Sequence, residues 1–319
     1  MQLTREQIKS AVFGAVRIEE NSREMRFFKC TKKQSAAWLA LSNTLGERAE
    51  ETTPGVRLDF HTDSKHLAFE GNGDYEVYIN DLFRGKFKLE ELGGRAELDL
   101  CDPLGDPLTD ARVTLIFPSH FIGGAFRSLT LDDGASFEPH RFDRKILFIG
   151  DSITQGWDSG WDSLSYAWRV MRFFNADAVV HGVGGGYFHA STFDFIDFDP
   201  DIVILALGTN DFSKYQTLDE LRMRAAEFMD LLAGEYKGKK IFCISPTWRA
   251  AQEKPMGHFR ECRRVVIEEA LKHGFIHING LDMVPPDPAF FADDTPLHPN
   301  ALGFGIYAEN LIREMQKHL

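Results

Sequence analysis

KILFIGDSITQGW, residues 145–157, joins an apolar run to a serine at its end. The run Ile146–Ile149 contains no polar residue, which is typical of a strand buried on both faces of a sheet. It stops at Gly150, and Asp151 and Ser152 follow directly. A serine in this position can cap a helix, bind a phosphate or attack a carbonyl carbon. The rest of the chain has to decide between these roles.

Further apolar runs follow this one, at residues 178–180, 202–207, 241–245 and 275–278. Between and after them, helical patterns cover about residues 167–174, 218–232, 257–273 and 301–315. The second of these helices is predicted to begin at Thr217 with a capping-box spacing and to end near Gly234. Strands alternating with helices predict a parallel sheet covered by helices on both faces. In such sheets the functional site lies beyond the carboxyl ends of the strands.

In the first part of the chain, apolar residues recur with a different period. Short segments such as 56–62 and 75–80 alternate apolar and polar residues, with turn signals between them. This pattern indicates an antiparallel β-sandwich. We therefore expect two domains: a jelly-roll-like β-sandwich over residues 1–140, and an α/β domain over residues 141–319. The α/β domain is expected to hold a flavodoxin-like, doubly wound, parallel five-stranded sheet.

The composition limits the classes of partner that this protein is expected to bind. The formal net charge of −12 argues against binding to nucleic acid or to an anionic membrane. The N-terminus lacks a signal-peptide pattern, and no apolar run is long enough to span a bilayer. The four cysteines form no CxxC pair, and no metal-ligand spacing is present. We expect a cytoplasmic, reduced protein without a cofactor, and its oligomeric state stays open.

Four polar features stand where the fold puts its site. Ser152 follows the first strand, the glycine run 182–186 follows the second, Asn210 follows the third, and His298 precedes the last helix. Acyl transfer needs a hydroxyl nucleophile, a histidine base and fixed donors for the oxyanion of the tetrahedral intermediate. Backbone N–H groups of a glycine turn and a side-chain amide are suitable donors.

At these residues the chain resembles the SGNH hydrolases, also called the GDSL esterase/lipase family. The resemblance rests on four blocks in the family's order: GDSI at 150–153, GVGG at 182–185, GTND at 208–211 and LHPN at 297–300. It implies the SGNH hydrolase fold over about half of the chain. The preceding β-rich part resembles, less specifically, the β-sandwich ahead of this domain in some carbohydrate esterases.

The resemblance also implies roles. Ser152 would be the nucleophile and His298 the general base. Gly185 and Asn210, with the Ser152 N–H, would form the oxyanion hole. Gly185 is chosen over its glycine neighbours by aligning the run with the family's Gly-x-x-Gly.

The resemblance also implies a carboxylic acid that orients the histidine, but this chain has no acid at the family's usual position. The family usually places it three residues before the histidine, where this chain has Thr295. Asp294 and Asp293 stand one and two residues earlier. Either Asp294 reaches the imidazole because the segment bulges, or a backbone carbonyl orients His298. Asp294 is the favoured third member and Asp293 the weaker rival.

Simpler interpretations remain for single residues. Ser152 alone would suit a helix N-cap, the glycines a phosphate nest, Asn210 an Asx turn and His298 a turn. Asp151 and Asp211 are expected to be structural caps. We expect the substrate to be contacted by side chains that follow strand ends, namely Trp157, Trp248 and Arg249, although Trp248 could simply pack on the sheet.

The sequence predicts a serine esterase acting on short acyl esters of a small molecule or carbohydrate. An O-acetyl group on a carbohydrate is the favoured substrate, by family analogy. Alternatives are a lipase or thioesterase acting on longer chains, and an acyltransferase. A non-catalytic carbohydrate-binding protein is disfavoured by the intact Ser, Gly, Asn and His set.

Overall fold

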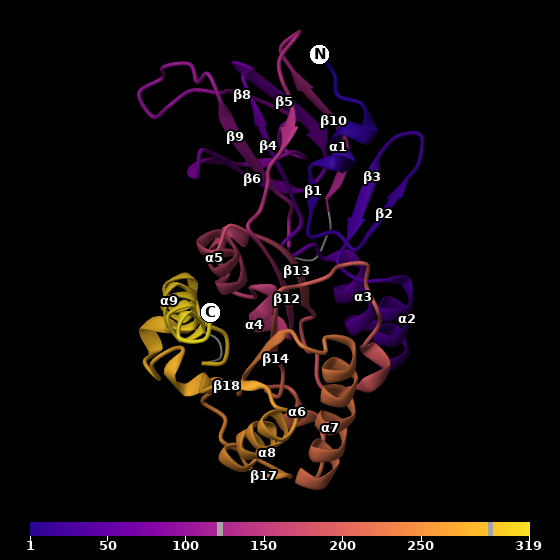
Figure 1. Cartoon of the computed structure of the whole chain (residues 1–319), viewed down its shortest axis with the longest axis vertical. Helices are drawn as coiled ribbons and strands as arrows, with labels where there is room; N and C mark the ends of the chain where they lie inside the picture. The colour runs from indigo at the N-terminus through magenta and orange to yellow at the C-terminus, as the bar shows by residue number, and fades with distance from the viewer. Residues whose placement is uncertain (120–123, 293–295) are drawn as a thin grey trace. The chain divides into compact units, whose positions relative to one another are not determined.

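The computed structural model describes residues 1–119, 124–292 and 296–319 (Figure 1). The chain divides into two compact units. The N-terminal unit comprises Met1–Lys29 and Glu50–Phe142, and the α/β unit comprises Cys30–Ala49 and Asp143–Leu319. The expected boundary at residue 140 lies two residues from the observed one, but residues 30–49, assigned to the first domain from the sequence, pack within the second unit.

The α/β unit is built on a five-stranded parallel sheet, as predicted. Its strands are β12 (Arg144–Gly150), β13 (Ala176–Gly182), β14 (Ile202–Ala206), β15 (Lys240–Ile244) and β18 (Ile276–Ile278). Their spatial order, β13-β12-β14-β15-β18, is the flavodoxin-like doubly wound order. Apolar side chains of β12, β14 and β15 are buried, because helices cover both faces of the sheet.

Four helices of this unit match the predicted ranges, namely α5 (Tyr166–Phe173), α7 (Leu218–Glu235), α8 (Phe259–Lys272) and α9 (Ala301–Gln316). The short helices α4 (Ser152–Gln155) and α6 (Asp211–Lys214) lie outside the predicted ranges. Helix α5 packs with α9 on one face and α7 packs with α8 on the other (Figure 1). Thr217 caps α7 as expected, because its side chain accepts the N–H of Glu220 at 3.2 Å. Shorter pieces are 3₁₀ turns at Asp162–Leu164, Ala190–Thr192, Gly280–Asp282 and Pro288–Phe290, and strands β16 (Glu253–Lys254) and β17 (Gly257–His258).

Two helices that the sequence analysis did not predict belong to the same unit. Helices α2 (Lys32–Leu41) and α3 (Asn43–Glu51) form what we call the helical hairpin, of which all residues up to Ala49 belong to the α/β unit. A capping box between Thr31 and Gln34 begins α2. The hydroxyl of Thr31 and the ammonium of Lys33 both bind the carboxylate of Asp194, at 2.7 and 2.8 Å. Residues far apart in the chain thereby anchor the hairpin to the α/β unit.

The N-terminal unit is the predicted antiparallel β-sandwich, preceded by α1 (Arg5–Ser10). One sheet contains β1 (Val12–Phe13), β4 (Arg57–Thr62), β9 (Ala111–Ile116), β6 (Asp74–Ile79), β7 (Leu82–Lys88) and β11 (Glu138–Pro139). The other contains β2 (Arg17–Glu20), β3 (Met25–Phe28), β10 (Ala125–Leu131), β5 (His66–Gly71) and β8 (Arg95–Asp99). Buried aromatic side chains fill the core, among them Phe60, Phe69, Tyr75, Phe117 and Phe126.

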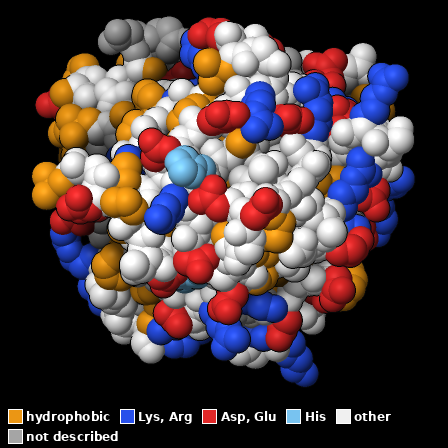
Figure 2. Space-filling view, turned by 90° about the horizontal axis from the view of Figure 1, so that it is seen from above, with side chains coloured by type: hydrophobic (Ala, Val, Ile, Leu, Met, Phe, Trp, Pro, Cys, Tyr) orange, Lys and Arg blue, Asp and Glu red, His pale blue; other side chains and the backbone are white. Residues whose placement is uncertain are grey.

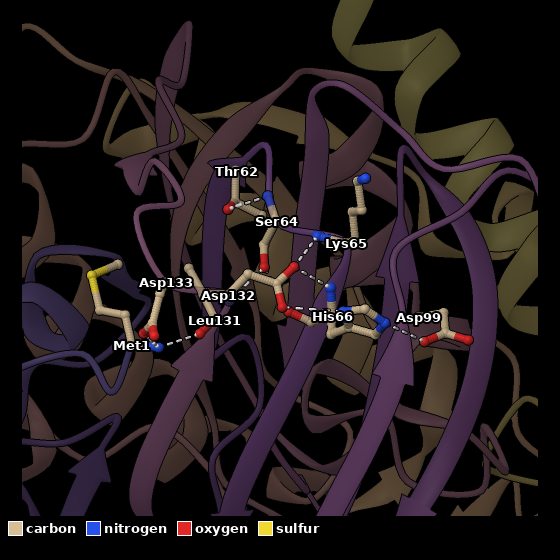
Figure 3. A network of polar contacts seen from close by, with 9 residues as sticks. All are labelled: Met1, Thr62, Ser64, Lys65, His66, Asp99, Leu131, Asp132 and Asp133. Carbon is tan, nitrogen blue, oxygen red and sulfur yellow. Dashed lines mark hydrogen bonds and ion pairs between the residues drawn. The ribbon is translucent and has the colours of Figure 1, made fainter.

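A polar network ties the strand ends of this sandwich together (Figure 3). The carboxylate of Asp132 accepts the N–H groups of Lys65 and His66 at 2.7 and 3.2 Å. The same carboxylate lies 3.1 Å from His66 Nδ1, and His66 Nε2 lies 3.5 Å from Asp99. The Lys65 N–H is the main cause of a lowered pKa at Asp132. These contacts fix the turn between β4 and β5 onto the end of β10.

Charge is dispersed on the face drawn in Figure 2, where acidic and basic side chains alternate without a broad area of one sign. Among the residues described, no helix combines the length and the apolar character that a bilayer crossing requires.

Candidate active site

Ser152 is the first residue of α4, directly beyond the carboxyl end of β12. The carboxylate of Asp151 caps this helix by accepting the N–H of Ile153 at 2.9 Å, so Asp151 is the structural cap that was predicted. Helix α4 ends after one turn at Gly156, whose φ of 91° lies in the left-handed region. The N–H of Trp157 then donates to the carbonyl oxygen of Ser152 at 2.9 Å. The serine thus stands on a short helical turn that is fixed at both ends.

His298 lies beside the serine. Its Nε2 is 2.8 Å from Ser152 Oγ, within hydrogen-bond reach. The backbone of His298 accepts the N–H of Ala292 at 3.0 Å, and Asn300 begins α9 by accepting two N–H groups of its first turn. The Asn300 amide also donates to the carbonyl oxygen of Phe291 at 3.2 Å. The structure therefore brings the two central residues of the sequence prediction together in the geometry of a nucleophile and its base.

Asp158 completes the arrangement, and the sequence analysis missed it. Its Oδ2 lies 3.1 Å from His298 Nδ1, on the side of the ring opposite Ser152. It stands in the loop after α4 with φ at 66°, a conformation that aspartate adopts more readily than most residues. A carboxylate in this position can hold the imidazole in one tautomer and stabilise the imidazolium. The expected acid, Asp294, and its rival, Asp293, lie outside the described residues.

The glycine run after β13 forms a tight turn. The N–H of Gly186 donates to the carbonyl oxygen of Val183 at 2.7 Å, which leaves Gly184 and Gly185 at the centre. The φ of Gly185 is 84°, whereas Gly184 has no positive φ, so the turn is of type II. Gly182 is also required, because a Cβ there would lie 2.4 Å from the backbone nitrogen of Gln155.

The donors of the expected oxyanion hole are available. Within the described ranges, the N–H groups of Ser152 and Gly185 donate to no protein group. Asn210 follows β14 and donates through Nδ2 to the carbonyl oxygen of Gly186 at 3.0 Å. A primary amide has two such hydrogens, so the other can serve a ligand. The bond to Gly186 links the asparagine to the glycine turn.

The expected substrate contacts differ in their surroundings. The half-buried Trp157 has its ring centroid 6.3 Å from that of His298, and Trp248 packs edge-on against Phe291 at 5.2 Å. Arg249 is buried, with its guanidinium against the rings of Phe212 and Phe259. Its Nη1 donates to the carbonyl oxygen of Thr209 at 2.8 Å. The structure thus brings Trp157 to the catalytic pair, whereas Arg249 supports the turn that carries Asn210.

Asp211 is a buried carboxyl beneath the site. Its Oδ1 accepts the N–H of Phe188 at 2.9 Å, which agrees with the structural role predicted for it. Its Oδ2 has no hydrogen-bond partner among the residues described. Burial raises the pKa of Asp211 to about 7, with backbone N–H groups opposing the shift. The buried Asp151 has its pKa raised to about 7 for the same main reason.

This burial predicts a pH dependence of stability. Because the pKa of Asp211 rises from 3.8 to about 7 on folding, the folded chain binds more protons between these values. The free energy of unfolding should therefore fall as the pH rises through this window. Asp211→Asn keeps the acceptor for Phe188 but never ionises, so it should be more stable than the wild type at pH 8, on the order of a few kcal/mol. Denaturant unfolding at pH 5 and pH 8 measures this, and an equal difference at both values would contradict it.

Comparisons with known proteins agree with this geometry. A sequence model of the GDSL-like lipase/acylhydrolase family matches residues 148–306. A search of curated proteins by sequence finds no match.

Solved structures match almost the whole chain. A salicylyl-acyltransferase from a tetracycline biosynthetic pathway is 18% identical, with a TM-score of 0.80 over 96% of this chain and 94% of its own. A putative GDSL-like lipase from Bacteroides ovatus is 16% identical, with a TM-score of 0.73 over 99% and 97%. A family two carbohydrate esterase from Clostridium thermocellum, in complex with cellohexaose, is 15% identical, with a TM-score of 0.69 over 96% and 98%. At these identities the likeness establishes the two-part fold.

The family match spans the serine turn, the glycine turn, the asparagine turn and His298. Through this region the chain belongs to the GDSL-like lipase/acylhydrolase family, the SGNH hydrolases, and is an ester hydrolase.

Proposed function

We propose that this protein is a serine esterase that removes short acyl groups, namely O-acetyl groups carried by a carbohydrate. The observation that carries the proposal is the relay from Ser152 Oγ to His298 Nε2, at 2.8 Å, and from His298 Nδ1 to Asp158, at 3.1 Å. In this relay the serine has a base and the base has an orienting carboxylate. No cofactor is needed for such a reaction.

The mechanism has two halves. His298 takes the hydroxyl proton as Ser152 Oγ bonds to the ester carbonyl carbon, and the carbonyl oxygen becomes an oxyanion. The N–H groups of Ser152 and Gly185 and the amide of Asn210 bind that oxyanion. The intermediate then expels the alcohol, which receives the proton from His298, and leaves an acyl group on Ser152. Water, deprotonated by His298, attacks the acyl carbon, and the carboxylic acid departs as the serine regains its proton.

The proposal that the substrate is a carbohydrate is supported by analogy with a carbohydrate esterase and by the aromatic side chain beside His298. A carbohydrate esterase of the same two-part fold was solved in complex with cellohexaose. The half-buried ring of Trp157 lies beside His298, where an aromatic face is suited to contact an apolar face of a substrate. We propose Trp157 and Trp248 as substrate contacts.

Acyl-chain preference tests this substrate class. With p-nitrophenyl esters from acetyl to decanoyl, kcat/KM should be highest for acetyl or another short group, because Trp157 crowds the side of His298. Acetylated and deacetylated sugars then test the alcohol, by release of acetate. A kcat/KM that climbs steadily to decanoyl would instead favour the lipase or thioesterase alternative.

Transfer to an acceptor other than water is the second candidate. It is favoured by the acyltransferase that shares the fold over 96% of this chain with a TM-score of 0.80. Both reactions use the same acyl-enzyme and differ only in the nucleophile that resolves it. Adding alcohols or sugars at rising concentration should leave acetate as the main product for an esterase, whereas an acyltransferase would divert most acyl groups to the acceptor.

We also propose a cytoplasmic location. All four cysteines are free thiols, and three of them are buried. Free thiols are typical of a reducing compartment, which supports this part of the proposal.

A further inference from the structure

Both polar groups of the peptide bond between Gly184 and Gly185 have an assigned partner. Its N–H, from Gly185, is the group proposed to bind the oxyanion. Its carbonyl oxygen, from Gly184, accepts a hydrogen bond from Arg48 Nη1 at 2.8 Å. Because a peptide unit is planar and rigid, a group that fixes the carbonyl oxygen also fixes the direction of the N–H.

The two glycines do not hold this peptide in one orientation by themselves. Glycine adopts positive and negative φ about equally well, so rotation of the central peptide can exchange a type II turn for a type I turn. The rotation would turn the Gly184 carbonyl oxygen to the side that the Gly185 N–H now faces. An oxygen there would repel an oxyanion. The hydrogen bond from Arg48 favours only the orientation with the N–H on that side.

Arg48 reaches the turn from α3, in the helical hairpin. Its guanidinium lies over the ring of Trp157, 4.8 Å from the centroid. On the preceding peptide, the N–H of Gly184 donates to Gln155 Oε1 at 2.8 Å. Leu45, also on α3, would lie 3.2 Å from a Cβ on Gly185. Side chains from α3 and α4 therefore contact the turn, and the group that donates to the Gly184 carbonyl oxygen is a charged guanidinium.

The positive charge of Arg48 also affects the strength of the Gly185 N–H as a donor. Hydrogen bonds from a guanidinium are about twice as strong as neutral ones. Donation to a carbonyl oxygen polarises the amide, and linked hydrogen bonds strengthen one another by roughly 10–30%. Polarisation by Arg48 makes the N–H on the other side of the same amide a better donor. The effect is largest when the bound oxygen carries most charge, which is in the transition state.

We propose that Arg48 is a positioning residue of the oxyanion hole, which locks the Gly184–Gly185 peptide with its N–H directed at the reacting oxygen. This inference rests on the proposed function, because it takes the Gly185 N–H as an oxyanion donor. A segment inserted between strands of the N-terminal unit then completes the catalytic machinery of the α/β unit.

Arg48→Met tests the proposal, because methionine keeps the aliphatic stem and lacks a donor. The kcat for p-nitrophenyl acetate should fall about 10- to 100-fold with KM changed less than about threefold, since the lost interaction acts on the developing charge. Asn210→Ala removes a whole oxyanion donor and should lower kcat by about 10²–10³, which is the upper limit expected for Arg48→Met. Binding of a boronic acid, whose tetrahedral serine adduct places an oxygen in the hole, should weaken by a factor similar to the loss in kcat.

Two further variants separate positioning from general damage to the hairpin. Arg48→Lys keeps a charged donor and should retain more activity than Arg48→Met. Lys33→Ala loosens the hairpin at Asp194 without touching the glycine turn, and it should keep wild-type kcat. If Arg48→Met does not fold, Arg48→Ala assayed with added guanidinium ion carries the same test, with recovery of kcat expected.

The outcomes distinguish this inference from the proposed function. Folded Arg48→Met with undiminished kcat, or with a change confined to KM, would overturn the role of Arg48 while wild-type hydrolysis stands. A matching loss in Lys33→Ala would overturn it too, because the effect would then come from the hairpin as a whole. Absence of hydrolysis in the wild type itself would reject the proposed function.

Discussion

Replacing Ser152 with alanine is expected to lower ester hydrolysis by about 10⁶ in kcat, the scale seen when a serine hydrolase loses its nucleophile. Without Oγ no acyl-enzyme can form, and the oxyanion donors alone supply only a small part of the rate enhancement. The fold should persist, because the cap of α4 comes from Asp151 rather than from Ser152. Steady-state hydrolysis of p-nitrophenyl acetate and thermal unfolding measure the two effects.

The matched control is Ser213→Ala, which removes an exposed hydroxyl from α6. It should leave kcat and stability within about twofold and about 0.5 kcal/mol of the wild type. Stable Ser152→Ala protein with unchanged turnover would show that another group performs the attack.

Asp158→Asn is expected to lower kcat by at least about a hundredfold, with an upper guide near 10⁴. Asparagine preserves the size of the side chain, and it tolerates the positive φ of this position as well as aspartate does. Its amide, however, can stabilise the wrong imidazole tautomer and gives no charge to balance the imidazolium. The loss should appear in kcat, because the charge on His298 develops only during reaction.

Asp294→Asn is the variant to compare with Asp158→Asn, since the family spacing places the acid close to Asp294. If Asp158 is the orienting acid, Asp294→Asn should do much less. Near-normal activity in Asp158→Asn, with a large loss in Asp294→Asn, would reverse the assignment. Near-normal activity in both would mean a Ser152–His298 pair oriented by a backbone carbonyl.

The sheet was predictable because its signal is local. The central strands of the α/β unit contain runs of apolar residues, and burial on both faces of a sheet favours that pattern. Chain order and strand ends then placed Ser152, Asn210 and His298 near one edge, and the contact between Ser152 and His298 follows from that topology. The helix beginning at Thr217 was likewise readable from its capping residues.

The helical hairpin was missed for a different reason. Alternating segments on either side led us to treat residues 30–49 as part of the sandwich, although Thr31 and Gln34 carry a capping-box spacing. That these residues pack with the α/β unit depends on contacts such as Thr31 to Asp194, which no sequence period encodes. The role proposed for Arg48 was invisible for the same reason.

Asp158 was missed because family spacing directed attention to the residues before His298. Its placement depends on a tight loop, in which Gly156, Asp158 and Gly160 all have positive φ. The loop returns the carboxylate to the imidazole on the side away from Ser152. A triad is defined by geometry rather than by sequence order, so the carboxylate that orients the histidine can come from any part of the chain.

The most direct test of the central claim is mass spectrometry of the protein after reaction with a fluorophosphonate, which phosphonylates activated serines. The account predicts one adduct per chain, on the peptide that contains Ser152, with loss of esterase activity in proportion to labelling. The adduct should be absent in Ser152→Ala and form much more slowly in His298→Ala. Active protein that gains no adduct, or an adduct on another residue that abolishes activity, would contradict the account.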